Sequence, residues 1–124
     1  MNIKEYHQEF NKALQRLIEA TEAEDTPLNR DATIQRFEFT YELAWKLLKK
    51  LLATKDIDVR SPKETLQTAL QQGYIQNGSD WTELHKNRNL TIHTYDQALA
   101  EEVYRFVIQS AVSLFQQLNE IQYD

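Results

Sequence analysis

The sequence predicts an all-α protein, an antiparallel up-and-down bundle of four or five helices. The chain has only two glycines and two prolines in 124 residues, and helix-favouring Leu, Ala, Glu, Gln and Lys are frequent. Apolar residues recur every three or four positions, and no segment shows the alternating pattern of a strand. Short predicted connections favour antiparallel neighbours, and the length suits a single domain spanning residues 1–124.

The first two predicted helices carry the longest apolar patterns. The first runs from Ile3 through Phe10 to Leu17 and ends in the turn segment EAEDTPLNR. The second runs from about Asp31 to Ala53 and carries two apolar stripes. One stripe contains Ile34, Phe37, Tyr41, Ala44, Leu48 and Leu51, and the other contains Phe39, Leu43 and Leu47. Two stripes give the helix more apolar surface than a monomeric bundle of this size needs to cover. We therefore expect one stripe to contact a second subunit in a homodimer.

The third predicted helix has a strong start signal. Ser61, Pro62 and Glu64 combine an N-cap serine, proline at the first helical position and glutamate at the third. The pattern predicts a short helix that ends near Gly73, followed by the turn segment GYIQNGSD.

Two further capping signals predict the remaining helices. Asp80 with Glu83 predicts the start of one helix, and Thr94 with Gln97 predicts the start of the last. The apolar pattern of that last helix extends from about Leu99 to Ile121 as one long element.

Composition narrows the function classes. The absence of cysteine excludes thiolate catalysis, cysteine-ligated zinc and a disulfide framework, and is compatible with a reducing compartment. The N-terminal segment MNIKEYHQEF has no apolar run, and nowhere do eighteen apolar residues follow one another. We therefore expect a soluble, cytoplasmic protein with no membrane association.

Charge is unevenly distributed along the chain. The net charge of −5 argues against non-specific binding to a phosphate backbone. The segment 45–63, however, holds six basic and two acidic residues. This segment fits either a patch that faces RNA or a solvated helix face with basic residues near its C-terminal end, and the charge pattern alone favours the second interpretation.

The segment RNLTIHTYD, residues 88–96, carries the chemistry-bearing side chains. Arg88 shares a helix face with Trp81 and Leu84, the side predicted to face the core. Burying a guanidinium without an anion is costly, so Arg88 is expected to line a groove or meet a partner. His93 and Tyr95 follow near the start of the last helix, where free backbone N–H groups favour anions. The segment thus predicts a phosphate site.

These residue types are sufficient for RNA cleavage without a metal. Histidine can transfer a proton near neutral pH, and arginine can stabilise a developing phosphorane charge. RNA supplies its own nucleophile, the 2′-hydroxyl, and two copies of His93 across a twofold axis could act as base and acid. From spacing alone, however, Arg88 and His93 fit an ion-pairing and helix-capping set better than a catalytic pair.

Other polar and aromatic residues receive structural interpretations. His7 is expected on the surface and His85 beside the bundle, while Trp45 and Trp81 are expected in the core. No Glu-x-x-His pattern suggests a di-metal site, so no metal is expected. The spacing of the scattered carboxylates suggests solvated helix faces, and these are Glu38, Glu42, Glu101 and Glu102.

Three sequence blocks resemble one family. IQRFEFTYELAWKLLKKLL, SPKETLQTALQQGYI, and DW followed by RNLTIHTYD are similar to the HepT-like proteins of the HEPN superfamily, also known as nucleotidyltransferase substrate-binding proteins. The similarity covers roughly residues 30–110. It implies a HEPN-type helical-bundle homodimer, with the R-x4-H-x-Y pattern in a groove at or near the dimer interface. It also implies a ribonuclease toxin paired with an MntA-like minimal nucleotidyltransferase as antitoxin.

The resemblance assigns roles to particular residues. Arg88 and His93 match the ribonuclease arginine and histidine, and Asn89 matches the polar residue after the arginine. Tyr95 matches the tyrosine that the antitoxin modifies by AMPylation. A nucleotide attached two residues from His93 would fill the groove with negative charge and compete with RNA phosphate. Ile92 is bulkier than the small polar residue expected there, which affects the shape of the groove.

Two functional hypotheses follow, together with a structural one. The leading hypothesis is a metal-independent endoribonuclease toxin that needs no cofactor and is neutralised by AMP transfer to Tyr95. The net negative charge of the chain favours recognition of RNA by shape, with single-stranded loops as targets. The alternative is a non-catalytic subunit in which Arg88 binds phosphate and His93 donates a hydrogen bond, so that a nucleotide or other substrate is presented to the partner transferase. The structural hypothesis is a dimeric helical bundle with no catalytic or binding role.

Overall fold

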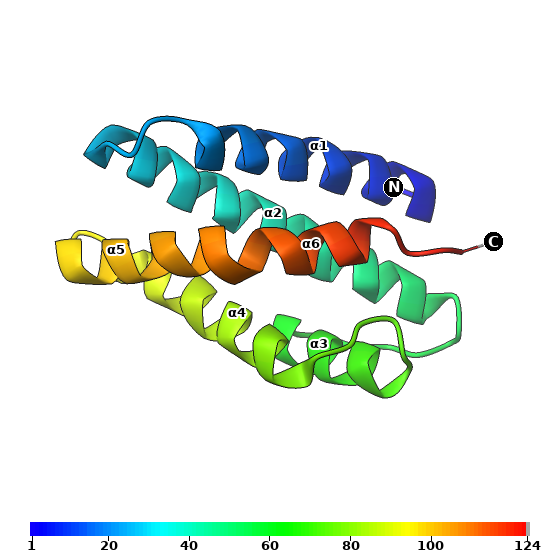
Figure 1. The fold of residues 1–124 in the computed structure, drawn as a ribbon. Helices are drawn as coiled ribbons and strands as arrows, with labels where there is room; N and C mark the ends of the chain where they lie inside the picture. Colours follow the sequence, from blue (N-terminus) through cyan, green and yellow to red (C-terminus); the bar gives the residue numbers. More distant parts are fainter. Residues whose placement is uncertain (124) are drawn as a thin grey trace.

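The computed structural model describes residues 1–123, and every regular element in that range is helical (Figure 1). The all-α class is therefore confirmed. The elements are α1 (Ile3–Glu22), α2 (Pro27–Ala53), α3 (Pro62–Gln71), α4 (Gly78–Leu90), the 3₁₀ turn η1 (Thr91–His93), α5 (Gln97–Phe106), the π-helical segment η2 (Val107–Ala111) and α6 (Val112–Asn119).

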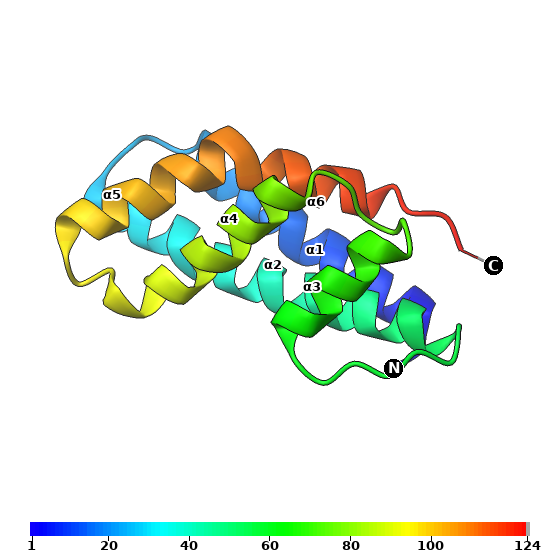
Figure 2. The same cartoon turned by 90° about the horizontal axis from the view of Figure 1, so that it is seen from below.

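The long helices run up and down. α1 and α2 form an antiparallel hairpin, and α4 runs antiparallel to the continuous rod made by α5, η2 and α6 (Figure 1). The short α3 packs against α2 and α4, at the end of the bundle opposite the α1–α2 turn (Figure 2). This agrees with the predicted antiparallel bundle of four or five helices.

Aromatic side chains from the four helices α1, α2, α4 and α6 meet at the centre of the core. The ring of Phe115 lies 5.9 Å from Phe10, 6.1 Å from Phe37 and 6.4 Å from Trp81, measured between centroids. Two of these contacts are edge-on, the geometry that aromatic quadrupoles prefer. The predicted core position of Trp81 is confirmed, since only 2 % of this residue is exposed.

The two predicted stripes of α2 have different environments. All six residues of the first stripe are buried. Of the second, Leu47 is fully buried, Leu43 is half-buried and Phe39 is 38 % exposed. Part of the second stripe is therefore covered within the chain, because α2 packs against α1 and against α3 to α5. The contact expected between this stripe and a second subunit stays a prediction, and Phe39 and Leu43 are the residues left to make it.

α2 begins four residues earlier than the apolar pattern indicated. It starts at Pro27 rather than near Asp31, and the Thr26 hydroxyl accepts a hydrogen bond from the backbone N–H of Asn29 at 3.1 Å. Thr-Pro is an N-cap followed by a first-turn proline, a local signal that outweighs the apolar period. The start of α3 is as predicted, since the Ser61 hydroxyl accepts from the backbone N–H of Glu64 at 3.1 Å.

The other two predicted caps are wrong. α4 starts at Gly78 after Asn77, which adopts a left-handed conformation with φ of 64°, so Asp80 lies inside the first turn. α5 is capped by Asp96, whose carboxylate accepts from the backbone N–H groups of Ala98 and Leu99 at 2.9 and 3.3 Å. An aspartate two residues closer to the helix reaches those groups more easily than Thr94.

The last helix also departs from the predicted single α-helix. The π-helical turn Val107–Ala111 interrupts it, and α6 ends at Asn119 rather than near Ile121. His7 is half-buried rather than on the surface, because its Nε2 lies 2.7 Å from the carbonyl oxygen of Asn119 and its Nδ1 lies 3.0 Å from the hydroxyl of Tyr123. These bonds join the end of the chain to α1.

No helix in residues 1–123 has the combination of length and apolar character needed to span a bilayer.

Candidate functional site

Arg88 lies at the end of α4 and contacts α2. Its Nη2 atom is 3.5 Å from Oε1 of Glu42, and its guanidinium carbon lies 5.8 Å from the centre of the Tyr41 ring. The other carboxylate oxygen of Glu42 accepts a hydrogen bond from the indole N–H of Trp45 at 3.1 Å. The arginine side chain is 26 % exposed and its Nε is buried without a hydrogen-bond partner in the described residues. Within the chain, the anion that Arg88 contacts is Glu42, and the expected groove or partner stays a prediction.

His85 belongs to the same cluster, one helical turn before Arg88. Its Nδ1 lies 2.6 Å from the hydroxyl of Tyr41, and its Nε2 lies 3.5 Å from the amide nitrogen of Asn89. Tyr41 therefore contacts two residues of α4, His85 through its hydroxyl and Arg88 through its ring face. We name Tyr41, Glu42, His85 and Arg88 the α2–α4 polar cluster.

Burial controls ionisation within the α2–α4 polar cluster. Burial raises the pKa of Tyr41 well above its usual value, while the nearby charge of Arg88 opposes the rise, so the phenol stays protonated. Burial also lowers the pKa of His85, helped by the positive charges of Lys63 and Arg88. The imidazole is therefore neutral at pH 7, and Arg88 carries the only positive charge of the cluster.

His93 and Tyr95 lie just beyond α4 and face solvent. His93 ends the 3₁₀ turn η1, and its Nδ1 is 3.4 Å from the Tyr95 hydroxyl, a long hydrogen bond. The two rings meet edge to face with centroids 6.0 Å apart. Tyr95 is 81 % exposed, and the neighbouring Ile92 is 69 % exposed. The predicted proximity of His93 and Tyr95 is therefore present.

Threonine hydroxyls hold this segment on the end of α4. Thr91 donates to the carbonyl oxygen of Arg88 at 2.7 Å, and Thr94 donates to the carbonyl oxygen of Thr91 at 3.0 Å. The anion site expected at the start of α5 is wrong, because the Asp96 carboxylate already accepts from the N–H groups there. A phosphate would have to bind through side chains.

The structure places Arg88 and His93 on one segment but in different surroundings. Arg88 turns toward α2, whereas His93 is exposed beside Tyr95. Within residues 1–123 no hydrogen bond or ion pair joins the two side chains. Asn89, the third member of the predicted set, is exposed and contacts His85 instead. A single chain therefore holds the motif in an open arrangement.

A cavity of about 280 Å³ opens beside Tyr95. It lies between the first turns of α2 and α5, and Arg30 lines it together with Asp31 and Glu101. Arg30 is paired with Asp25 at 2.6 Å and with Glu101 at 3.2 Å, so its charge is already balanced. The end of the molecule that carries Tyr95 is therefore acidic.

Sequence reasoning missed Glu42 and His85. Glu42 was interpreted as a solvated carboxylate, yet it is the acid nearest Arg88. A signal was available, since Glu42 is adjacent to the core residue Tyr41 and a core-facing arginine requires an anion. Trp45 was expected in the core but is half-buried, with its indole N–H bonded to Glu42. His85 lies beside the bundle, as predicted.

The described residues contain no group of three His, Cys, Asp or Glu side chains placed to hold a metal ion.

Comparison with protein families gives a match over residues 3–122, to the family described as nucleotidyltransferase substrate binding protein like. The chain belongs to this family. The match spans nearly the whole bundle, including both helices of the α2–α4 polar cluster and the His93–Tyr95 segment. The resemblance seen in the sequence blocks is thereby confirmed.

Individual relatives agree with the family. A Haemophilus influenzae protein named probable ribonuclease HepT is 41 % identical over 100 residues, covering 73 % of this chain and 68 % of the relative. A crystal structure of a protein from Thermus thermophilus is 34 % identical with a TM-score of 0.81, covering 88 % of this chain and 94 % of that one. The structure of HI0074 from Haemophilus influenzae is 30 % identical with a TM-score of 0.73, covering 96 % of this chain and 97 % of that one. It is described as the fold of a substrate binding domain of a nucleotidyltransferase.

Proposed function

We propose that the protein is a metal-independent endoribonuclease in which Arg88 and His93 act on RNA. The observation that carries the proposal is that Arg88, held by Glu42 at the end of α4, is followed five residues later by the exposed imidazole of His93. The similarity to a probable ribonuclease HepT supports the same activity. Both side chains come from one segment that threonine hydrogen bonds hold against α4.

The proposed reaction uses the RNA 2′-hydroxyl as nucleophile. A histidine takes the 2′-hydroxyl proton as the oxygen attacks the adjacent phosphorus, and the bond to the 5′-oxygen breaks. A protonated histidine gives a proton to that leaving oxygen, so the products are a 2′,3′-cyclic phosphate and a 5′-hydroxyl. Arg88 stabilises the charge on the phosphorane oxygens.

We propose that the active form is a homodimer. Each chain offers one His93, while the reaction needs both a base and an acid. Ile92, His93 and Tyr95 are exposed together on one chain, and a twofold partner would cover Ile92 and bring two histidines into one groove. Activity would then depend on dimerisation.

Tyr95 is the proposed control point. Its hydroxyl is exposed, and a nucleotidyltransferase partner would need that access. In the proposed transfer, the Tyr95 oxygen attacks the α-phosphorus of magnesium-ATP held by the partner, pyrophosphate leaves and the phenolic proton passes to a base. The attached AMP places a negative charge beside His93 and blocks the groove. The protein would thus be the toxin of a HepT–MntA-type pair, with AMPylation as its neutralisation.

Cleavage of RNA tests the proposed activity. Purified protein is incubated in excess EDTA with a fluorescent single-stranded RNA, and the ends of the products are identified by mass. The proposal predicts 2′,3′-cyclic phosphate and 5′-hydroxyl ends, with rates reduced about 10²–10⁴-fold by His93→Ala. His7→Ala is the matched control. Equal rates for wild type and His93→Ala would contradict the proposal.

A second candidate is a binding subunit that presents a nucleotide to the partner enzyme. The cavity of about 280 Å³ beside Tyr95 favours it, as does the description of HI0074. In that case the chain binds a nucleotide without turnover and raises transferase activity on a third molecule. Calorimetry with ATP, ADP and AMP separates the two candidates, because a nucleotide that binds the unmodified chain in the absence of the transferase favours the binding subunit.

A further inference from the structure

One face of α2 carries an unbalanced positive charge. Trp45, Lys46, Lys49 and Lys50 follow Glu42 along the helix at spacings that place them on neighbouring positions of its surface, and we name these four residues the basic face of α2. All three lysines are exposed. Within residues 1–123 none of them forms an ion pair, and the nearest acid in the row, Glu42, is engaged by Arg88. The basic face therefore has cations available for a polyanion.

An open groove runs along the basic face. Its volume is about 530 Å³, and it is bounded by Tyr6 and Met1 from the start of the chain and by Leu43 and Trp45 from α2. The three lysines also line it. A surface that combines a half-buried indole with several ammonium groups suits single-stranded nucleic acid, where bases stack on aromatic rings and phosphates meet cations.

The basic face is continuous with the α2–α4 polar cluster. The indole N–H of Trp45 donates to one oxygen of Glu42 at 3.1 Å, and the other oxygen of Glu42 lies 3.5 Å from Arg88. From Glu42 to Lys49 is seven residues, about 10 Å along the helix axis at 1.5 Å per residue. A strand held at Arg88 therefore reaches the lysines within a few nucleotides.

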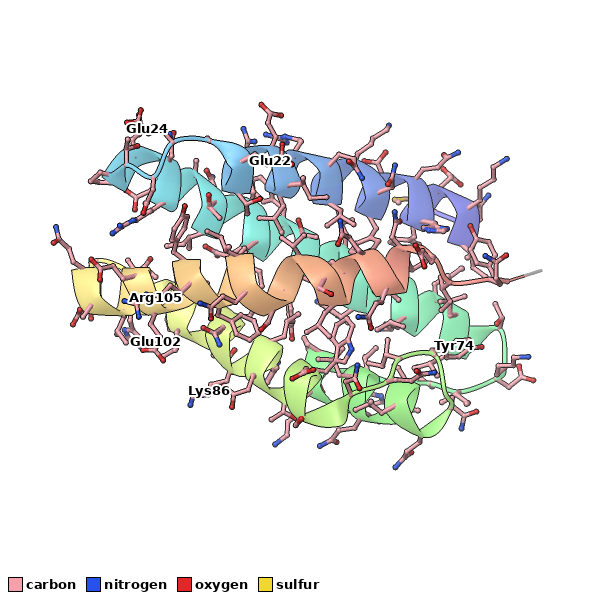
Figure 3. The ribbon with its side chains drawn as sticks, in the orientation of Figure 1. Glu22, Glu24, Tyr74, Lys86, Glu102 and Arg105 are labelled. Atoms are coloured by element: carbon pink, nitrogen blue, oxygen red, sulfur yellow. The ribbon has the colours of Figure 1, made fainter. Side chains whose placement is uncertain are left out.

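Negative charge at the other end of the bundle disfavours a path of RNA from Arg88 in that direction. The α1–α2 turn and the start of α5 lie at the same end of the bundle (Figure 1). Asp25, Asp31, Asp96 and Glu101 gather there. The two arginines among them are already engaged, since Arg30 is paired with Asp25 and Glu101, and Arg105 is paired with Glu101. Glu24 projects from the same turn (Figure 3). A polyanion leaving Arg88 meets repulsion at that end and attraction along α2.

We propose that the basic face of α2 is the binding track for single-stranded RNA beside the scissile phosphate. Lys46, Lys49 and Lys50 contact successive phosphates, and one base stacks on Trp45. The inference rests on the proposed ribonuclease function of Arg88 and His93. An RNA occupant is favoured over a protein partner because lysine is depleted at protein–protein interfaces, whereas uncompensated ammonium groups drive binding to phosphates.

The test compares two double variants. Lys46→Gln/Lys49→Gln removes two charges from the basic face. Lys12→Gln/Lys86→Gln is the matched control, since Lys12 lies on the exposed side of α1 and Lys86 points away from the bundle (Figure 3). Binding to a 2′-O-methyl oligonucleotide of about twelve residues is measured by fluorescence anisotropy at several salt concentrations. This probe binds as RNA does but lacks the attacking hydroxyl, so affinity is measured without cleavage.

The inference predicts about tenfold weaker binding for Lys46→Gln/Lys49→Gln and a salt slope smaller by about 1.4, at roughly 0.7 for each lost phosphate contact. The control variant should keep the affinity and slope of wild type. Quenching of tryptophan fluorescence by the oligonucleotide should disappear in Trp45→Phe. Unchanged affinity and slope in Lys46→Gln/Lys49→Gln would overturn the inference, as would equal losses in both double variants.

Cleavage assays separate this inference from the proposed function. If wild type cleaves RNA, the track predicts that Lys46→Gln/Lys49→Gln lowers kcat/KM on a long RNA but not on a dinucleotide. Normal cleavage of both substrates by the variant would overturn the track and leave the ribonuclease proposal intact. If wild type does not cleave, selective loss of oligonucleotide binding would still support the track. Selective loss of transferase binding with normal RNA affinity would overturn it and assign the face to the protein partner.

Discussion

Nη2 of Arg88 lies 3.5 Å from Oε1 of Glu42, so the arginine of the R-x4-H-x-Y segment is held by a carboxylate of another helix. The carboxylate is fixed in turn by Trp45, and the guanidinium lies over the ring of Tyr41. This arrangement fixes the direction in which Arg88 presents its charge, and it joins α2 to the end of α4. Four predictions follow from this and neighbouring contacts.

Glu42→Gln should lower RNA cleavage about tenfold, equivalent to roughly 1.4 kcal/mol in the barrier. The loss arises because the neutral amide holds the guanidinium less firmly than the carboxylate does. Glu38→Gln, on the same helix, is the control. The measurement is kcat on a short RNA at saturation. A rate equal to or above wild type would mean that Glu42 competes with the RNA phosphate for Arg88 instead of positioning it.

The ion pair of Arg88 and Glu42 should also contribute to the free energy of unfolding. Both side chains are partly exposed, so a double-mutant cycle with Glu42→Gln and Arg88→Met should give a coupling free energy of about 0.5–1 kcal/mol. Urea unfolding of the four proteins measures it. A coupling near zero would show that the contact does not persist in solution.

The stability of the fold should decrease as pH falls below about 7. His85 has a lowered pKa in the folded chain, because of burial and the charges of Lys63 and Arg88. The unfolded chain therefore binds a proton near pH 6.5 more strongly than the folded chain does, and the free energy of unfolding falls as pH decreases through that value.

His85→Gln should reduce this dependence. Urea unfolding at pH 7.5, 6.5 and 5.5 measures it, with His93→Gln as the control because His93 is exposed. If His85→Gln leaves the difference between pH 7.5 and 5.5 as large as in wild type, the loss of stability comes from other groups.

Asp96→Ala should destabilise the protein by about 1 kcal/mol, the usual cost of removing an N-cap. Its carboxylate satisfies two backbone N–H groups at the start of α5. Thr94→Ala removes only a bond to the carbonyl oxygen of Thr91 and should cost less. Thermal unfolding of the two variants compares them. A larger effect of Thr94→Ala would restore the cap predicted from the sequence.

The fold was predictable where signals are local and redundant. Ser61 and Pro62 mark the start of α3 without ambiguity, and the apolar period of α2 identifies the buried stripe through Phe37 and Tyr41. The starts of α4 and α5 were not predictable in the same way. A left-handed Asn77 begins α4 with no side-chain cap, and both Thr94 and Asp96 are good N-cap residues, so only the path of η1 decides between them.

The site was predictable as a segment but not as an arrangement. The residue types between Arg88 and Tyr95, together with the family resemblance, indicated the candidate residues, and the cost of an unpaired guanidinium indicated an anion nearby. The identity of that anion depends on how α4 crosses α2, which sequence spacing does not contain. The interpretation of Glu42 and Trp45 failed for this reason, since both lie at the crossing.

The proposal that the protein is a toxin neutralised at Tyr95 can be decided by intact-mass spectrometry. The protein is incubated with a partner nucleotidyltransferase and magnesium-ATP, and wild type is compared with Tyr95→Phe. Tyr74→Phe serves as the control, since Tyr74 lies at the turn between α3 and α4, at a distance from η1 (Figure 3). We expect a gain of one or more AMP units in wild type and Tyr74→Phe and none in Tyr95→Phe. An unmodified wild-type protein beside a transferase shown to be active on ATP would contradict the proposal.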